Sequence, residues 1–266
     1  MSTRSSAAHM EIDGLEIAYR VDGSDSADAL VLVNSLGTDL RLWDPQMESL
    51  ARHYRVIRYD CRGHGDSDVP PGPATIDRLG ADLLALLDQL HVERAHICGL
   101  SLGGLTALWV AAHHPERVDR AVFANTGARL GTSESWDDRM RAVRAGGMAA
   151  IRDTVVARFL GTRFRAAHPD VASRIGDMVE ATSASGYLAA CAALRDADLR
   201  DVVANIRAPS LIVAGELDES APVRLSEELH AAIAGSELVV LAGAAHLTNV
   251  ERAEEFARLV VDWFAG

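Results

Sequence analysis

A serine flanked by glycines is the feature of this sequence that most constrains its fold. Ser101 stands in Gly99-Leu100-Ser101-Leu102-Gly103, after an apolar run over 95–98 and before a helical pattern over 104–112. A direct turn from strand to helix strains the serine backbone and leaves no room for larger flanking side chains. The turn would lift the hydroxyl out of the sheet, beside the first N–H groups of the helix. The motif therefore predicts a nucleophilic serine, although the pentapeptide alone also fits an ordinary turn.

The rest of the chain alternates between apolar runs and segments with helical spacing. Continuous apolar runs are typical of strands covered on both faces, whereas apolar residues three and four apart indicate helices. The predicted strands are a hairpin over 10–21 that turns at Asp13-Gly14, and runs at 29–33, 55–59, 95–100, 120–124, 210–214 and 237–241. The other predicted helices cover 76–90, 222–235 and 250–264. This alternation predicts an α/β fold with a mostly parallel, doubly wound sheet.

One internal segment, residues 130–205, interrupts the alternation. It has helical patterning, many arginines and no clear strand, and it lies between two predicted sheet strands. We expect it to form a helical cap over the carboxyl ends of the strands, where ligands bind in such sheets. The predicted parts are therefore a core of residues 10–129 and 206–266, the cap over 130–205, and an N-terminal segment 1–9 that is disordered or a remnant of cloning.

Composition excludes several classes of protein. The 266 residues carry a net charge of −12 and include no lysine, which excludes Schiff-base chemistry, pyridoxal-phosphate enzymes and the phosphate-loop motif. The sequence contains no basic patch of the kind that nucleic-acid binding requires. No apolar run approaches the ~18 residues of a membrane span. The three widely spaced cysteines predict neither a disulfide framework nor a cysteine metal site. Since no signal peptide is visible either, we expect a cytoplasmic protein without metal, cofactor, nucleic-acid or membrane partner.

A serine nucleophile needs a base, and the base needs a carboxylate that orients it. Asp218 follows the next-to-last predicted strand and His246 follows the last one, so both belong to the sheet edge where Ser101 lies. Glu216 and Glu219 compete with Asp218, which we favour for its distance from the strand end and from the following proline. The order serine, acid, histidine is typical of the α/β-hydrolase fold.

Such a site also needs two backbone N–H groups for the negatively charged oxygen that forms during the reaction. In this fold one comes from the residue after the nucleophile, here Leu102, and one from the loop after an earlier strand. That loop reads Asn34-Ser35-Leu36-Gly37-Thr38, and Leu36 is the predicted donor.

The same loop distinguishes the chain within the fold, because most relatives have His-Gly where it has Asn34-Ser35. The loop and its continuation to Trp43, together with the serine pentapeptide, closely resemble the 3-oxoadipate enol-lactonases of bacterial aromatic catabolism. Further motifs share the resemblance, which runs from about residue 10 to the C-terminus: Asp60-Cys61-Arg62-Gly63-His64-Gly65, Asn125-Thr126-Gly127-Ala128-Arg129 and Ala245-His246-Leu247-Thr248-Asn249-Val250-Glu251. The resemblance implies that a small anionic enol-lactone is opened to 3-oxoadipate without a cofactor. A carboxylesterase, another lactonase, a perhydrolase and a non-catalytic binding protein stay open as alternatives.

The substrate that the resemblance implies has a free carboxylate, which requires a local arginine in a chain of charge −12. Arg129 follows a predicted strand, and Arg139 and Arg144 lie in the cap beside Trp136, so these side chains are the candidate substrate contacts. Surface exposure of the arginines and simple packing of Trp136 are the alternatives. Either a monomer or a homodimer fits the sequence.

Overall fold

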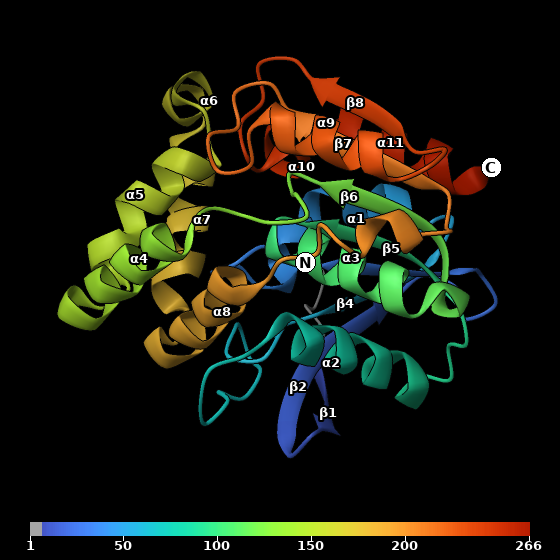
Figure 1. The fold of residues 1–266 in the computed structure, drawn as a ribbon, viewed down its shortest axis with the longest axis horizontal. Coiled ribbons are helices and arrows are strands. Elements are labelled where there is room, and N and C mark those ends of the chain that lie inside the picture. The colour runs from blue at the N-terminus through green and yellow to red at the C-terminus, as the bar shows by residue number, and fades with distance from the viewer. Residues whose placement is uncertain (1–6) are drawn as a thin grey trace, which may run out of the picture.

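A single sheet lies at the centre of the molecule. The computed structural model describes residues 7–266, and its eight strands follow the order β1-β2-β4-β3-β5-β6-β7-β8 (Figure 1). The strands are β1 (Ala8–Ile12), β2 (Leu15–Asp22), β3 (Ala29–Val33), β4 (Arg55–Tyr59), β5 (Ala95–Leu100), β6 (Val118–Ala124), β7 (Ser210–Gly215) and β8 (Glu237–Leu241). β2 pairs antiparallel with β1 and with β4, whereas all the other pairs are parallel. The predicted mostly parallel sheet is thus confirmed.

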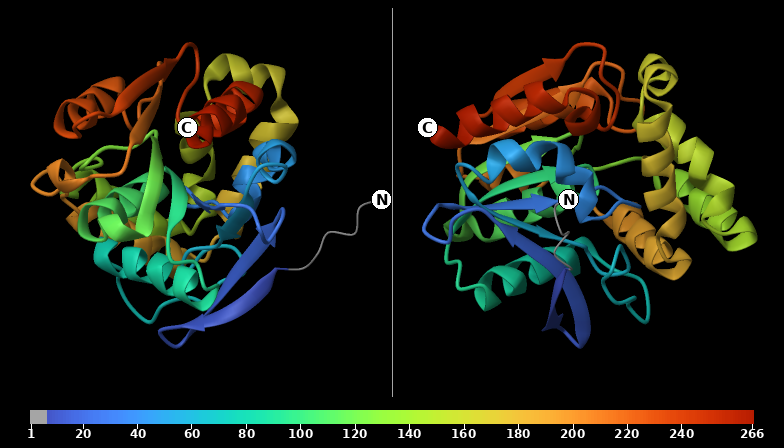
Figure 2. Two further views of the ribbon diagram at one scale, coloured as in Figure 1. Left: turned by 90° about the vertical axis from the view of Figure 1, so that its right-hand side faces the viewer. Right: turned by 180° about the vertical axis from the view of Figure 1, so that it is seen from behind.

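Helices cover both faces of this sheet. The helices of the sheet layers are α1 (Asp44–Leu50), α2 (Ile76–Gln89), α3 (Leu102–His113), α9 (Val223–Ala232), α10 (Thr248–Glu251) and α11 (Ala253–Ala265). Short 3₁₀ helices are η1 (Leu40–Trp43), η2 (Pro115–Arg117) and η3 (Val203–Asn205). The left view in Figure 2 shows α1 and α11 on one face of the sheet and α2, α3 and α9 on the other.

The strand and helix on either side of Ser101 are the most deeply buried pair of elements. Every residue of β5 is buried, and so is every residue of α3 except the last. A helix that is apolar on all sides is stable only when protein surrounds it, and α3 lies between β5, β6 and α2. The start of α3 therefore stands on a closely packed base, which holds the preceding serine in place.

Between β6 and β7 the chain folds into five successive helices. They are α4 (Ser133–Gly146), α5 (Ala149–Phe159), α6 (Thr162–Ala167), α7 (Pro169–Ala181) and α8 (Ala184–Asp196). In Figure 1 they stand together at the left, beside the edge of the sheet where the parallel strands end. Helix α8 touches the core backbone to backbone, because a Cβ added to Gly186 would lie only 2.1 Å from the carbonyl oxygen of Gly63. We call α4–α8 the inserted helices; their treatment as a separate cap stays a prediction.

The N-terminal hairpin corrects one sequence expectation. Its turn at Asp13 and Gly14 has positive φ at both residues, 53° and 74°, which suits a tight two-residue turn. However, β1 already begins at Ala8, where pairing with β2 orders the backbone of Ala8 and His9. Disorder was therefore a wrong prediction for these two residues, and positions 1–6 of that segment lie outside the described residues.

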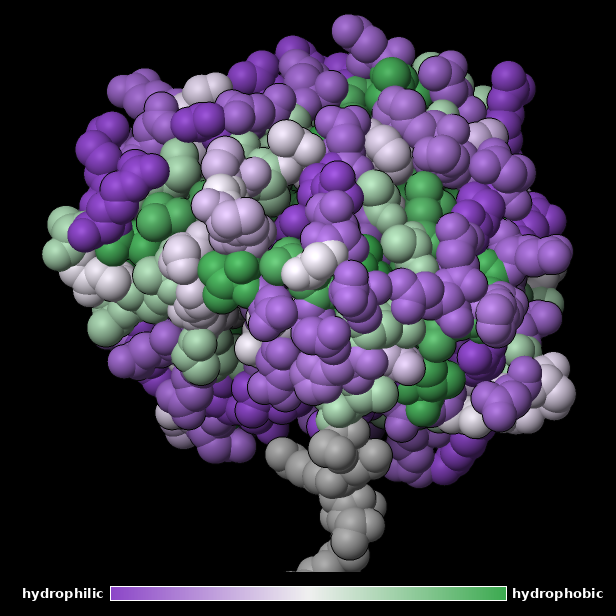
Figure 3. Space-filling view, turned by 90° about the horizontal axis from the view of Figure 1, so that it is seen from below, coloured by the Kyte–Doolittle hydropathy of each residue, from purple (hydrophilic) through white to green (hydrophobic). Residues whose placement is uncertain are grey.

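The described surface is mostly polar. On the face drawn in Figure 3, hydrophilic side chains dominate and hydrophobic ones form small scattered groups. Within residues 7–266, the large hydrophobic side chains that are exposed are those of Val69, Leu217 and Val240. None of the helices in this part of the chain is long and apolar enough to cross a membrane.

Candidate active site

The turn between β5 and α3 has the strained geometry that the glycine-flanked serine predicts. Ser101 adopts φ 57° and ψ −115°, a conformation that ordinary residues avoid and that costs roughly 1–3 kcal/mol. A Cβ on Gly99 would lie 2.2 Å from the Gly103 carbonyl oxygen, and one on Gly103 would lie 2.1 Å from that of Val33. The Ser101 N–H donates to the Ala124 carbonyl at 2.9 Å, which ties the turn to the end of β6. Backbone contacts on all sides therefore fix the serine.

Asp218 and His246 form a buried pair on the neighbouring loops. The His246 Nδ1 lies 2.8 Å from Asp218 Oδ2, and Asn125 Nδ2 donates to the same oxygen at 3.0 Å. The other oxygen accepts the backbone N–H groups of Ser220 and Ala221 at 2.8 and 2.9 Å. Burial alone would raise the pKa of Asp218, but the charge of His246 and these hydrogen bonds outweigh it and hold the pKa below its usual value. The carboxylate is thus kept ionised beside the imidazole.

Ser101 and His246 line one cavity of about 150 Å³. The Phe159 ring stacks on the imidazole with 5.3 Å between centroids, and the Leu247 N–H donates to the Phe159 carbonyl at 2.9 Å. Because Asp218 holds Nδ1, Nε2 is the ring nitrogen left for the serine hydroxyl. The described residues show no hydrogen bond between Ser101 Oγ and His246, a contact that in unliganded enzymes often tightens only when substrate binds.

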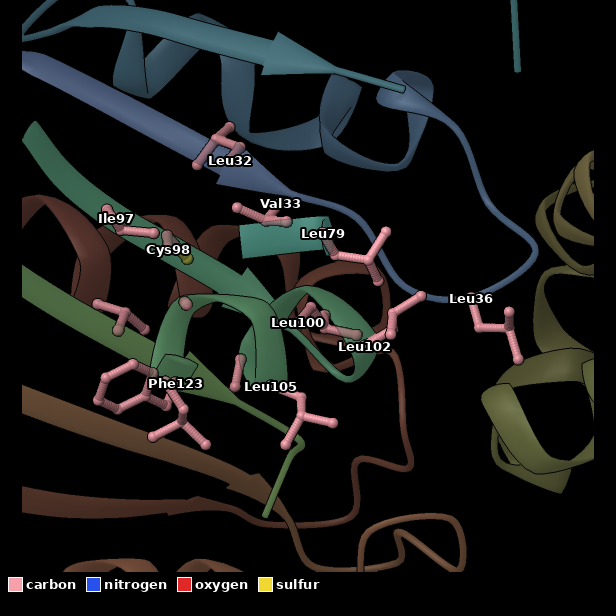
Figure 4. Packing of buried hydrophobic residues seen from close by; sticks show 14 of the residues in the cluster. Leu32, Val33, Leu36, Leu79, Ile97, Cys98, Leu100, Leu102, Leu105 and Phe123 are labelled. Carbon is pink, nitrogen blue, oxygen red and sulfur yellow. The ribbon is translucent and has the colours of Figure 1, made fainter. Parts of the chain in front are cut away.

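The two predicted N–H donors lie on adjacent elements. Leu102 is the first residue of α3, so its N–H has no helical acceptor, and Leu36 lines the cavity on the loop after β3. Within residues 7–266 the Leu36 N–H finds no acceptor either. Figure 4 shows Leu102 where β5 turns into α3, and Leu36 on the loop that runs from Val33 toward the inserted helices. β3 and β5 are neighbours at the point where the strand order reverses, which is where such sheets bind ligands.

Asn34 has a structural task in this loop. Its side-chain amide donates to the Tyr59 carbonyl at 2.8 Å and its oxygen accepts from Trp43 Nε1 at 2.9 Å. Both polar atoms are therefore satisfied in a residue that is only 3% exposed. The amide ties the start of the Leu36 loop to β4 and η1, which fixes the position of the loop.

The inserted helices supply the opposite wall of the cavity. Trp136 and Arg139 of α4 and Arg158 of α5 line it. Trp136 donates from Nε1 to the Leu130 carbonyl at 2.6 Å, and the Arg139 guanidinium lies over its ring, 5.3 Å from the centroid. Arg139 Nη1 also donates to the Tyr187 hydroxyl at 3.4 Å. Within residues 7–266, neither Arg139 nor Arg158 forms an ion pair with a carboxylate, so both charges stay available to a ligand.

Two of the predicted arginines lie elsewhere. Arg129 faces a separate cavity beside α9 and pairs with Asp198 at 3.4 Å. Arg144 is exposed five residues beyond Arg139 on α4 and faces a groove beside Pro70 and its neighbours. The structure corrects the prediction for both residues, because helix rotation and the path of the loop after β6 turn their side chains away from Ser101.

Comparison with known proteins decides the family. The model of the α/β hydrolase fold family matches residues 28–253. The 3-oxoadipate enol-lactonases 1 and 2 of Acinetobacter baylyi are 37% and 39% identical, over 92% and 91% of this chain and 92% and 90% of theirs. The chain belongs to the 3-oxoadipate enol-lactonase group of the α/β hydrolases. By class it is a hydrolase of carboxylic esters and lactones.

Other relatives of this hydrolase agree. A crystal structure of the enol-lactonase from Burkholderia xenovorans superposes with a TM-score of 0.96 at 42% identity, covering 97% of this chain and 100% of that one. A pimeloyl-(acyl-carrier protein) methyl ester esterase of Neisseria meningitidis is 31% identical over 91% of this chain and 95% of its own length. The names of both groups of relatives thus describe enzymes that hydrolyse an ester or a lactone.

Several residues at the site of this hydrolase were not found from the sequence. Asn125 has a positive φ of 49° at the end of β6, and its oxygen accepts from Thr248 while its amide holds Asp218. Its position directly after a buried strand could have identified Asn125 as a candidate site residue. Arg158 and Phe159 gave no signal, because only the packing of α5 brings them to His246. Within residues 7–266, no group of three or more His, Cys, Asp or Glu side chains is placed to hold a metal ion.

Proposed function

We propose that this protein hydrolyses 3-oxoadipate enol-lactone to 3-oxoadipate, with Ser101 as the nucleophile. The observation that supports this most directly is the pair of arginines without carboxylate partners, Arg139 and Arg158, in the same small cavity as Ser101 and His246. A guanidinium can bind a carboxylate through two hydrogen bonds, so these side chains suit an anionic ester or lactone. The names of the relatives identify enol-lactones as their substrates.

The size of the cavity supports a small substrate. Its volume is about 150 Å³, below the ~300–1,000 Å³ typical of pockets for drug-sized ligands. A six-carbon lactone with one carboxylate suits this volume better than a long acyl chain does. The ring of Trp136 and the Phe159 side chain give it an apolar lining between the charged groups.

In the first half of the proposed reaction, Ser101 Oγ attacks the lactone carbonyl while His246 Nε2 takes the hydroxyl proton. The negative charge that develops on the carbonyl oxygen is stabilised by the N–H groups of Leu36 and Leu102. Asp218 stabilises the positive imidazolium through the 2.8 Å contact to Nδ1. As the intermediate collapses, the acyl C–O bond breaks and the His246 imidazolium gives its proton to the departing enol oxygen, and the enol then converts to a ketone.

In the second half, water releases the acyl group. His246 takes a proton from the water, and the hydroxide attacks the ester carbonyl in the same oxyanion site. The bond between the acyl carbon and Ser101 Oγ then breaks while His246 returns the proton to Oγ, which leaves free Ser101 and a second carboxylate on the former lactone carbon. The residues supply every proton transfer, so the proposed reaction requires no cofactor.

The partner of this protein is a small molecule, and we propose that it works in the cytoplasm. Its three cysteines, Cys61, Cys98 and Cys191, are free, which suits a reducing compartment. The net charge of −12 does not favour nucleic acid. Both a monomer and a homodimer fit the proposal.

The proposal is tested by steady-state kinetics with the enol-lactone and with p-nitrophenyl acetate, a neutral ester. We expect Arg139→Gln to raise KM for the enol-lactone about 30-fold, because a charge-assisted hydrogen bond contributes roughly 2 kcal/mol. The KM for the neutral ester should change less than about twofold.

Arg144→Gln is the matched control, since it removes the same charge from the same helix outside the cavity. It should leave both substrates unaffected. Failure to hydrolyse the enol-lactone, with the neutral ester still turned over, would establish a general esterase instead. Equal effects of Arg139→Gln on both substrates would remove the carboxylate contact from the proposal.

A further inference from the structure

The cavity beside Ser101 contains a carboxylate, Glu219, that the proposed reaction does not use. Glu219 directly follows Asp218 in the loop after β7 and lines the cavity with Ser101 and His246. In the part of the chain that the structure describes, no arginine or histidine lies within ion-pair distance of its carboxylate. Glu219 is exposed to solvent, but because it also lines the small cavity of the nucleophile, its charge acts on every ligand that enters.

Glu219 gives the cavity two walls of opposite charge. Ser101, His246 and Glu219 come from loops at the ends of the parallel strands, which form the core wall. The positive charges of Arg139 and Arg158 come from α4 and α5 on the facing wall. A ligand with one carboxylate is therefore attracted with that group toward the inserted helices and with its other end toward Ser101.

The charge of the ligand changes during the reaction that we propose for this site, on which the inference rests. Water adds its hydroxyl to the lactone carbonyl carbon and a hydrogen to the enol oxygen, and the acyl C–O bond breaks. The enol then converts to a ketone, and the new carboxylic acid loses its proton. A monoanion has become a dianion, and the new carboxylate forms at Ser101, on the same wall as Glu219.

We propose that Glu219 is a specificity-determining residue that weakens the binding of a second carboxylate at the Ser101 end of the cavity. Two carboxylates that share a small site disfavour each other, and specificity often depends on such a repulsive contact. When the monoanionic lactone is bound, its neutral ring lies on the side of Glu219. When the dianionic product is bound, its new carboxylate lies on that side and is repelled, so the product dissociates and inhibits the enzyme only weakly.

The test compares two stable six-carbon acids as inhibitors, adipate with two carboxylates and hexanoate with one. Inhibition constants are measured against hydrolysis of p-nitrophenyl acetate by the full-length enzyme. We expect Glu219→Gln to lower the inhibition constant of adipate about tenfold, as expected for removing a like charge at close range. The constant for hexanoate should change less than about twofold. Glu219→Asp, which keeps the charge, should retain the weak binding of adipate.

Glu227→Gln is the matched control, because Glu227 is exposed on α9 outside the cavity and its loss changes the net charge equally. It should alter neither inhibition constant. An unchanged adipate constant in Glu219→Gln, equal changes for both acids, or the same change in Glu227→Gln would each overturn the assignment. Since the reporter is a neutral ester, these outcomes are separate from a failure to hydrolyse the enol-lactone, which would refute only the proposed function.

Discussion

The two walls of the cavity are built in different ways. On the core wall, Ser101, Asp218 and His246 are buried, and glycine contacts and backbone hydrogen bonds hold the loops beneath them. On the facing wall, Trp136 and Arg139 are half-buried side chains on one face of a helix, and Arg158 is exposed on the next helix. One wall is fixed through its backbone, whereas the other depends on how helices pack.

The difference matches the tasks that we propose for the two walls. A reacting group must be held within tenths of an ångström, because small displacements cost large factors in rate. A carboxylate can be bound by a long arginine side chain that adjusts its position. We therefore expect substitutions of the catalytic residues Ser101, Asp218 and His246 to affect all substrates alike, and substitutions on the facing wall to affect only those with a carboxylate.

The largest expected effect is that of Ser101→Ala. Without the nucleophile, kcat/KM should fall at least about 10⁴-fold for the enol-lactone and for neutral esters alike, as in other serine hydrolases. Labelling by a fluorophosphonate probe should disappear as well. Steady-state kinetics and mass spectrometry of the labelled protein measure the two effects.

Ser135→Ala is the control, because Ser135 is a second serine in the same cavity. This variant should still react with the probe. Labelling that persists in Ser101→Ala, or that is lost only in Ser135→Ala, would place the nucleophile elsewhere and remove the distinction between the two walls.

The sequence was sufficient for the fold and for bringing Ser101, Asp218 and His246 to one edge of the sheet. Alternating apolar runs predicted the parallel sheet, because strands buried on both faces consist mainly of apolar residues. The order Ser101, Asp218, His246 sufficed to place these residues together, since each follows a strand and parallel strands end at one edge of the sheet. Position along the chain and position in space are closely linked in such loops.

The facing wall could not be predicted in the same way. Arg139 and Arg144 are only five residues apart on α4, yet one lines the cavity and the other a different groove. Which of them faces Ser101 depends on the rotation of the helix against α8, and that packing involves residues far apart in the sequence. The same holds for Arg158, which comes from another helix. Helical spacing alone therefore misplaced Arg144, and a position shortly after a strand was not enough to place Arg129.

The prediction of intermediate size concerns the junction between the core and the inserted helices, and its measured quantity is the free energy of unfolding. His64 follows Gly63, the residue that touches α8, and its ring is 1% exposed with no partner for Nε2 among residues 7–266. Burial lowers the pKa of His64 from its usual 6.5 to about 4, against the weaker opposing effects of the Arg62 carbonyl and Asp39. The folded protein therefore holds this ring neutral at pH 5, whereas the unfolded chain protonates it.

The sign of the pH dependence follows from that pKa. Stability that is fully present above pH 6.5 is lost as the pH falls from 6.5 toward 4. Between pH 7.5 and pH 5, the wild type should lose about 2 kcal/mol more unfolding free energy than His64→Gln, which cannot titrate there. Urea unfolding at the two pH values measures this difference. Identical losses in both proteins would show that this junction does not respond to pH, and His53→Gln, at an exposed histidine, is the control.

The smallest expected effect separates the walls most sharply. Tyr187 is fully buried, its ring lies against Gly37 of the Leu36 loop, and burial raises its pKa to about 12. The hydroxyl is therefore neutral and accepts a hydrogen bond from Arg139 at 3.4 Å. Tyr187→Phe keeps the ring and removes only this contact, so Arg139 should point into the cavity less often.

We expect Tyr187→Phe to raise KM for the enol-lactone about fivefold, since a single hydrogen bond contributes roughly 1 kcal/mol. The kcat for this substrate and both constants for p-nitrophenyl acetate should stay within about twofold of the wild type. A fall in kcat for the neutral ester would mean that Tyr187 acts through Gly37 on the Leu36 loop instead. The two walls would then be coupled through one buried ring, and recognition of the carboxylate could not be separated from the chemistry at Ser101.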